Sequence, residues 1–149
     1  MQGNLRAIDE DRAGLASSAR MIPAALALLR MASAYLFILH GTAKLLGYPH
    51  LQAFDDLHLV SLEGAAAVLE TLGGLAVLLG LWVRPVSFIL SGEMAFAYFI
   101  AHAPRGQVLL PLLNGGESAV LFCFIFLVLA AAGGGAWTLG GLVARHDRP

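Results

Sequence analysis

The chain has 149 residues, of which 58% are hydrophobic and 13% are charged. Soluble globular proteins carry about 25% charged residues, so this composition excludes an ordinary soluble domain. A net charge of −1 gives no electrostatic argument for nucleic-acid binding. The single cysteine, Cys123, excludes an internal disulfide and the paired-cysteine chemistry of a thiol–disulfide oxidoreductase.

The first apolar block follows a polar segment of mixed charge over residues 1–20. This block is too long for a cleavable signal peptide. We expect a polar cytoplasmic segment over 1–20 and a first membrane helix over about 21–46, which is long enough to cross a bilayer. Ser17 and Ser18 are candidate caps for its start, and Pro23 falls in the first turn, where proline is tolerated.

Three more apolar blocks predict helices at about 61–82, 85–103 and 115–132. Together the four blocks form a transmembrane domain over residues 21–140, followed by a short cytoplasmic tail over 141–149. The sequence therefore predicts an all-α integral membrane protein, built as an antiparallel four-helix bundle.

Basic residues in the short flanks predict the orientation, because cytoplasmic flanks are enriched in Lys and Arg. One side carries Arg6, Arg12, Arg20, Arg84, Arg145 and Arg148, and the other carries Lys44 and Arg105. We therefore expect both termini in the cytoplasm of a bacterium, with the inner membrane as the location.

Three charged residues, Arg30, Glu70 and Glu93, fall near the middle of the apolar blocks. A charge at bilayer depth is costly unless it is paired, so each is a functional-site hypothesis. At about 1.5 Å rise per residue, all three fall within about one helical turn of the same depth. We expect a structural ion pair between Arg30 and one carboxylate, with the other carboxylate, Glu70 or Glu93, as a candidate proton site. A purely helix-locking role for the group stays open.

A second polar layer is expected near the outer ends of the helices, and we interpret it as a possible quinone layer. Its candidate binding residues are His40, Lys44, Glu63, His102 and Glu117. Structural alternatives exist: Lys44 can extend to the surface along its aliphatic stem. Asn114 can cap the fourth helix, with Glu117 reaching back to it. His40 and His102 are a weak candidate pair for a metal or haem.

Taken in order, these residues resemble the DoxX family of small four-helix bacterial membrane proteins. The resemblance covers roughly residues 25–140. The matching residues are Arg30, His40-Gly41-x-x-Lys44, Gly47, Glu70-x-x-Gly73-Gly74, Leu79-Gly80-Leu81-x-x-Arg84, Asn114-Gly115-Gly116-Glu117 and Gly135-x-Trp137. The chain departs from the family at Gly140, where DoxX-like chains commonly carry an acid.

The resemblance implies a respiratory or redox setting. Members are associated with membrane oxidoreductase systems, including a thiosulfate–quinone oxidoreductase, and others are accessory subunits that tether redox partners. The sequence itself has no cysteine pair and no glycine-rich dinucleotide signature. We therefore expect no internal haem, flavin or iron–sulfur cluster, and we assign no metal site.

Two functional hypotheses follow. The first is a quinone-interacting membrane subunit of a redox complex, as opposed to a self-sufficient enzyme. Its partners would be the lipid bilayer and other membrane or peripheral redox proteins, with no nucleic acid. The second is a structural or assembly subunit that anchors a larger membrane complex, for which Phe122, Phe124 and Phe126 would offer an apolar face.

Overall fold

The structure is a computed structural model that describes the backbone of residues 2–141 and the side chains of residues 19 and 21–141. Over this range it is helical and contains no strand. The long helices are α1 (Gln2–Leu46), α2 (Leu62–Leu79), α3 (Val83–Ala97) and α5 (Glu117–Ala132). Short turns of helix are η1 (Gln52–Phe54), η2 (Tyr98–His102, a π-helix), η3 (Ala103–Arg105) and α4 (Pro111–Asn114).

Three helical segments are long and apolar enough to cross a membrane: Met21–Leu46, Leu62–Leu79 and Val83–Arg105. The fourth, Glu117–Ala132, is apolar but shorter. These segments confirm the all-helical membrane class.

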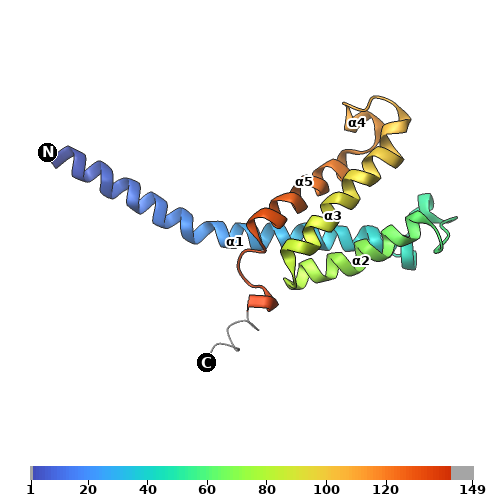
Figure 1. The fold of residues 1–149 in the computed structure, drawn as a ribbon, viewed down its shortest axis with the longest axis horizontal. Helices are drawn as coiled ribbons and strands as arrows, with labels where there is room; N and C mark the ends of the chain where they lie inside the picture. Colours follow the sequence, from blue (N-terminus) through green and yellow to red (C-terminus); the bar gives the residue numbers. More distant parts are fainter. Residues whose placement is uncertain (1, 142–149) are drawn as a thin grey trace.

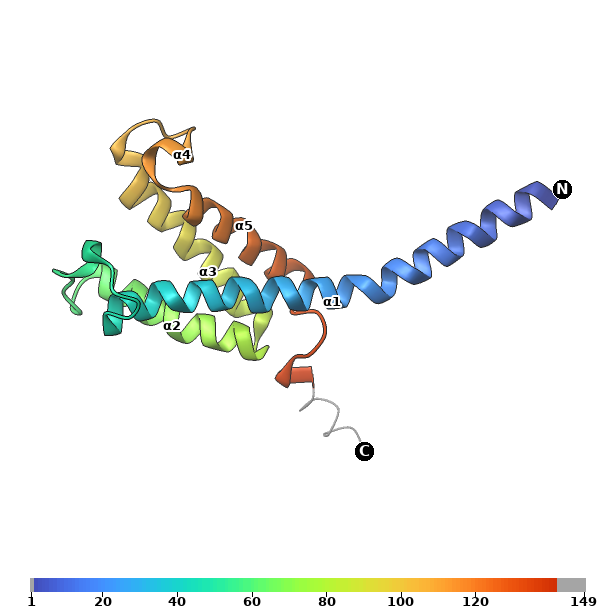
Figure 2. The ribbon, with the colours of Figure 1, turned by 180° about the vertical axis from the view of Figure 1, so that it is seen from behind.

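Helix α1 begins earlier than predicted, because the helix runs through the polar segment to Gln2. Ser17 and Ser18 therefore lie inside a helix, and the predicted cap at these positions is wrong. The polar segment contains few helix breakers, so the apolar helix can continue into it without a new nucleus. In Figures 1 and 2 this part of α1 projects away from the other helices.

Helix α2 starts where its sequence predicts and ends earlier than expected. The Ser61 hydroxyl accepts the N–H of Gly64 at 3.1 Å and caps the start. Gly80 takes a left-handed conformation, with φ 75°, and ends the helix. This stop comes before Trp82, which was the expected end.

The four long helices form two antiparallel pairs, α1 with α2 and α3 with α5 (Figure 1). Glycines allow the close approach: a Cβ at Gly41 would overlap Thr71 and lie 3.0 Å from the Ala67 carbonyl oxygen. A Cβ at Gly73 would lie 2.8 Å from Leu90 Cδ2, so this glycine sets the register of α2 against α3. Figures 1 and 2 both show the two pairs crossing at one end and diverging at the other.

Aromatic side chains join the two pairs. Phe37 of α1 packs against Phe122 and Phe126 of α5, with ring centroids 5.2 and 4.8 Å apart. Phe124 is 62% exposed. The expectation that Phe122, Phe124 and Phe126 share an outward face is therefore wrong. Residues four apart in a helix lie on one face, while the residue between them points away.

Candidate functional site

Arg30 is completely buried at the end of the two pairs where α2 stops, which we name the Arg30 end. Its guanidinium donates only to backbone carbonyl oxygens. Nε donates to Gly134 at 2.9 Å, one terminal nitrogen donates to Val77 and Leu78 at 2.9 and 2.6 Å, and the other donates to Ala136 and Trp137 at 3.3 and 2.9 Å.

These bonds use the full donor capacity of the side chain, because a guanidinium has five N–H groups. Two acceptors are last-turn carbonyls of α2, at the negative end of the helix dipole. The others belong to the segment that follows α5. Arg30 therefore ties the start of the apolar part of α1 to the end of α2 and to the segment 134–137.

The predicted ion pair between Arg30 and Glu70 or Glu93 is corrected by this geometry. Arg30 is level with the end of α2, and Glu70 lies seven residues before Val77, about 10 Å along the axis. The prediction took residue 21 as the inner end of the first helix. In the structure α1 extends to Gln2, so residue 21 does not mark the end of this helix. Arg30 instead lies close to one end of the region in which α1 and α2 pair.

Glu70 pairs with Lys44 instead. Lys44 Nζ lies 2.5 Å from Glu70 Oε1, with the two side chains 16% and 3% exposed. Lys44 was expected to extend to the surface, and this contact contradicts that interpretation. The second oxygen, Glu70 Oε2, is buried and has no hydrogen-bond partner within the described part of the chain.

Glu93 of α3 lies at the same level as Glu70. Each is three residues from the Gly73–Leu90 contact, and the two helices are antiparallel. Glu93 is close enough to interact electrostatically with Glu70 and Lys44. Both of its carboxyl oxygens are buried, and neither has a partner among residues 19–141. We name Lys44, Glu70 and Glu93 the Lys44 cluster. The prediction put Arg30, Glu70 and Glu93 at one depth; Glu70 and Glu93 share a level, whereas Arg30 does not.

The other residues of the predicted outer layer are divided between several places. His40 packs edge-on against Phe122, with ring centroids 5.8 Å apart, and interacts electrostatically with Lys44. His102 stacks on Tyr98, with centroids 6.2 Å apart. Glu63 and Glu117 are exposed in the first turns of α2 and α5.

A buried polar contact that the sequence did not predict closes the loop before α5. The Tyr98 hydroxyl donates to the Val108 carbonyl at 2.5 Å and accepts from Asn114 Nδ2 at 3.1 Å. Asn114 Oδ1 accepts the N–H of Gly116 at 2.9 Å. Gly116 is the N-cap residue of α5, so the predicted cap by Asn114 is wrong by two residues. The only sequence signal was a tyrosine in an apolar helix, followed by an asparagine at a turn.

Metal binding has no support in the described region, where no three His, Cys, Asp or Glu residues lie close enough to hold an ion. The Lys44 cluster instead offers an ammonium group and three carboxyl oxygens without partners. Such a set can bind a polar group that both accepts and donates hydrogen bonds, and it can exchange a proton with that group.

Comparison with known proteins gives the family. The model of the DoxX family matches residues 25–103. A protein of Haemophilus influenzae, described as an uncharacterized protein, is 44% identical over 124 residues. The match covers 78% of this chain and 89% of the relative. No solved structure matches the chain. The extent of the family match and of this relative shows that the chain belongs to the DoxX family.

Proposed function

We propose that the protein is a quinone-interacting membrane subunit of a respiratory or redox complex. In this proposal it spans the bacterial inner membrane as an antiparallel four-helix bundle with both termini in the cytoplasm. One observation carries the proposal: the Lys44 cluster holds a buried carboxyl group, Glu93, whose two oxygens have no partner among the described residues.

An unpartnered buried polar group costs about 1–3 kcal/mol, so its presence points to a ligand or a mobile proton. A quinol hydroxyl is a donor and matches the Glu93 oxygens. A quinone carbonyl is an acceptor and matches Lys44, which has three N–H donors and uses one on Glu70. These residue types fit a quinone head group in either redox state.

Within this site Lys44 would orient the head group, and Glu93 would hold or accept the proton of its hydroxyl. Glu70 would keep Lys44 in place through their ion pair. A bound quinone would supply the two-electron, two-proton couple. A redox partner protein would exchange the electrons, which is the reason for proposing a subunit.

A binding measurement tests the proposal. Binding of a short-chain ubiquinone to the detergent-purified protein is followed by equilibrium dialysis. Glu93→Gln keeps the size of the side chain and removes one charge-assisted hydrogen bond, so we expect about tenfold weaker binding. The control is Asp56→Asn, which also replaces a carboxylate by its amide, at an exposed position of the loop between α1 and α2, and which should bind as the wild type does.

Infrared difference spectra recorded on addition of the quinone give a second readout. They should contain a carboxyl band that Glu93→Gln removes and Asp56→Asn retains. Equal quinone affinities for the wild type and Glu93→Gln, or no binding by the wild type at all, would refute the proposal.

A second candidate function, a structural or assembly subunit, is supported by the projecting part of α1. From Gln2 the helix continues beyond the paired region (Figure 2), where it can contact a partner. Purification in mild detergent compares the full chain with a chain lacking residues 2–18. Loss of a co-purifying redox protein with unchanged quinone binding would support an assembly role for this segment, whereas an unchanged set of partners would exclude it.

A further inference from the structure

A recess of about 330 Å³ lies at the Arg30 end, outside the core. It is formed where α2 turns into α3 and where the segment after α5 passes beside that turn. Its lining includes Trp82, Arg84, Thr138 and the glycines Gly133 and Gly134. The recess is distant from the Lys44 cluster, because Lys44 lies more than ten residues further along α1 than Arg30.

The recess carries an accessible positive charge. The Arg84 side chain is exposed, and its Nε would lie 3.4 Å from a Cβ placed on Gly133, so the guanidinium runs along the glycine segment. Arg84 has no ion-pair or hydrogen-bond partner among the side chains that the structure describes. A side chain at Gly133 would crowd this position.

The described segments around the recess contain no acid that could neutralise this charge. Residues 21–46, 71–92 and 118–141, which meet at this end, contain neither Asp nor Glu. Within residues 21–141, the other fixed charge at this end is the buried Arg30, whose partners are all carbonyls. The recess therefore has a net positive potential that favours an anion.

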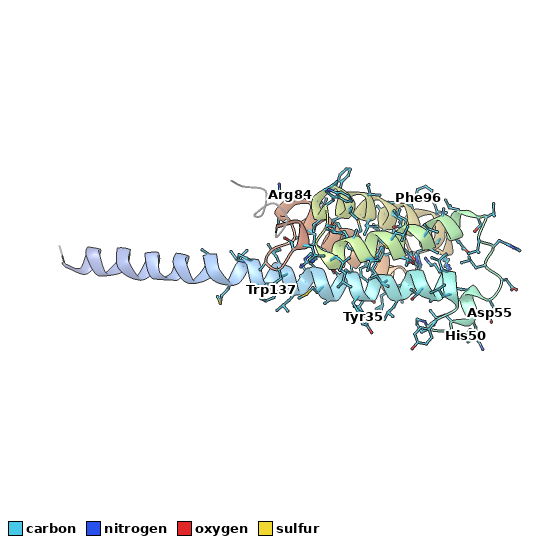
Figure 3. The ribbon with its side chains drawn as sticks, turned by 90° about the horizontal axis from the view of Figure 1, so that it is seen from below. Tyr35, His50, Asp55, Arg84, Phe96 and Trp137 are labelled. Carbon is cyan, nitrogen blue, oxygen red and sulfur yellow. The ribbon has the colours of Figure 1, made fainter. Side chains whose placement is uncertain are left out.

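Two exposed tryptophans place the recess at the depth of lipid head groups. Trp82 is 78% exposed and Trp137 is 66% exposed. Such rings are enriched at membrane–water interfaces. Figure 3 shows Arg84 and Trp137 at one end of the paired helices, with His50 and Asp55 at the opposite end. One turn beyond Arg84 on the same face of α3, Phe88 is 68% exposed and can line an acyl chain.

We propose that the recess beside Arg84 binds the phosphate of an anionic phospholipid, with an acyl chain lying along α3 past Phe88. Arg84 supplies the fork of donors that matches phosphate oxygens. The glycines leave room for the head group because they carry no side chains. The site is independent of the quinone proposal.

The test uses the full-length protein in detergent micelles and phosphatidylglycerol with brominated acyl chains, which quenches tryptophan fluorescence. Brominated phosphatidylcholine is the zwitterionic comparison. We expect tighter binding of phosphatidylglycerol, and an Arg84→Gln variant should lose about fivefold in affinity for it, the effect of one interfacial arginine. Arg84→Lys should retain most of the preference, because an ammonium still binds phosphate as a point charge.

The matched control is Arg105→Gln, the same change at an exposed arginine of the opposite end. It should keep the wild-type preference. Equal binding of the two lipids by the wild type, or a preference that survives Arg84→Gln, would overturn the proposal. Displacement of the lipid by sodium phosphate at equal concentration would also overturn it, because the ligand would then be a free anion. An unchanged unfolding midpoint of Arg84→Gln without lipid confirms that the fold is intact.

Discussion

The substitution Arg30→Lys tests the carbonyl contacts most directly. It keeps the positive charge and most of the aliphatic stem, while the planar fork becomes a single ammonium group. Arginine offers five donors in fixed directions, whereas lysine offers three from one atom. The carbonyls that Arg30 binds belong to two separate segments, the end of α2 and residues 134–137.

The expected loss of stability follows from the count of bonds. At least two of the five carbonyl groups lose their partner in Arg30→Lys. At about 1.5–3 kcal/mol for each hydrogen bond to a charged group, the free energy of unfolding should fall by roughly 3–6 kcal/mol. The damage should concentrate on the segment after α5, because residues 134–137 have no helix of their own to hold them.

Reversible unfolding in mixed micelles, followed by circular dichroism, measures this loss. Fluorescence anisotropy of Trp137 in a Trp82→Phe background reports on the released segment and should fall in Arg30→Lys. Arg105→Lys is the matched control, since an exposed arginine should change stability by less than about 0.5 kcal/mol. If Arg30→Lys and Arg105→Lys have the same free energy of unfolding, the hydrogen bonds from Arg30 to the backbone carbonyls do not stabilise the fold.

Two further substitutions test the packing and the loop closure. Gly41→Ala should lower the free energy of unfolding by about 1–3 kcal/mol, because the new Cβ would lie 2.7 Å from the backbone nitrogen of Thr71. Gly92→Ala is the control: no atom lies within 4 Å of its new Cβ, so it should retain or raise the unfolding midpoint. Tyr98→Phe should lower the free energy of unfolding by about 1–3 kcal/mol, because it leaves the side-chain amide of Asn114 without its acceptor. In the double variant with Asn114→Ala, the loss of stability should be smaller than the sum of the two single losses.

The helical class and several helix ends could be predicted from local signals. Long apolar blocks indicated the membrane-length segments. Ser61 and Gly80 set the ends of α2 through their own side-chain and backbone chemistry. The common level of Glu70 and Glu93 was predictable because a short turn joins α2 and α3 and fixes their relative height.

The partners of Arg30 could not be predicted in this way. Its acceptors are backbone carbonyls, which every residue carries, so the sequence gives no pattern for them. The depth argument also needed the true beginning of α1, and the helix extends nearly twenty residues past the apolar block. The one available hint was the glycine run 133–135, whose small residues allow the chain to fold back onto the guanidinium.

The contrast between the two ends strengthens the functional reading of the Lys44 cluster. At the Arg30 end the fold provides acceptors for every N–H of a buried guanidinium, drawn from segments more than forty residues apart. In the Lys44 cluster, three buried carboxyl oxygens of Glu70 and Glu93 have no hydrogen-bond partner in the described region. Native proteins satisfy nearly all their buried polar groups. A fold that satisfies one buried charge so completely, yet leaves one oxygen of Glu70 and both oxygens of Glu93 without a partner in the described region, has kept those oxygens available, and a proton or a polar ligand is what they can take.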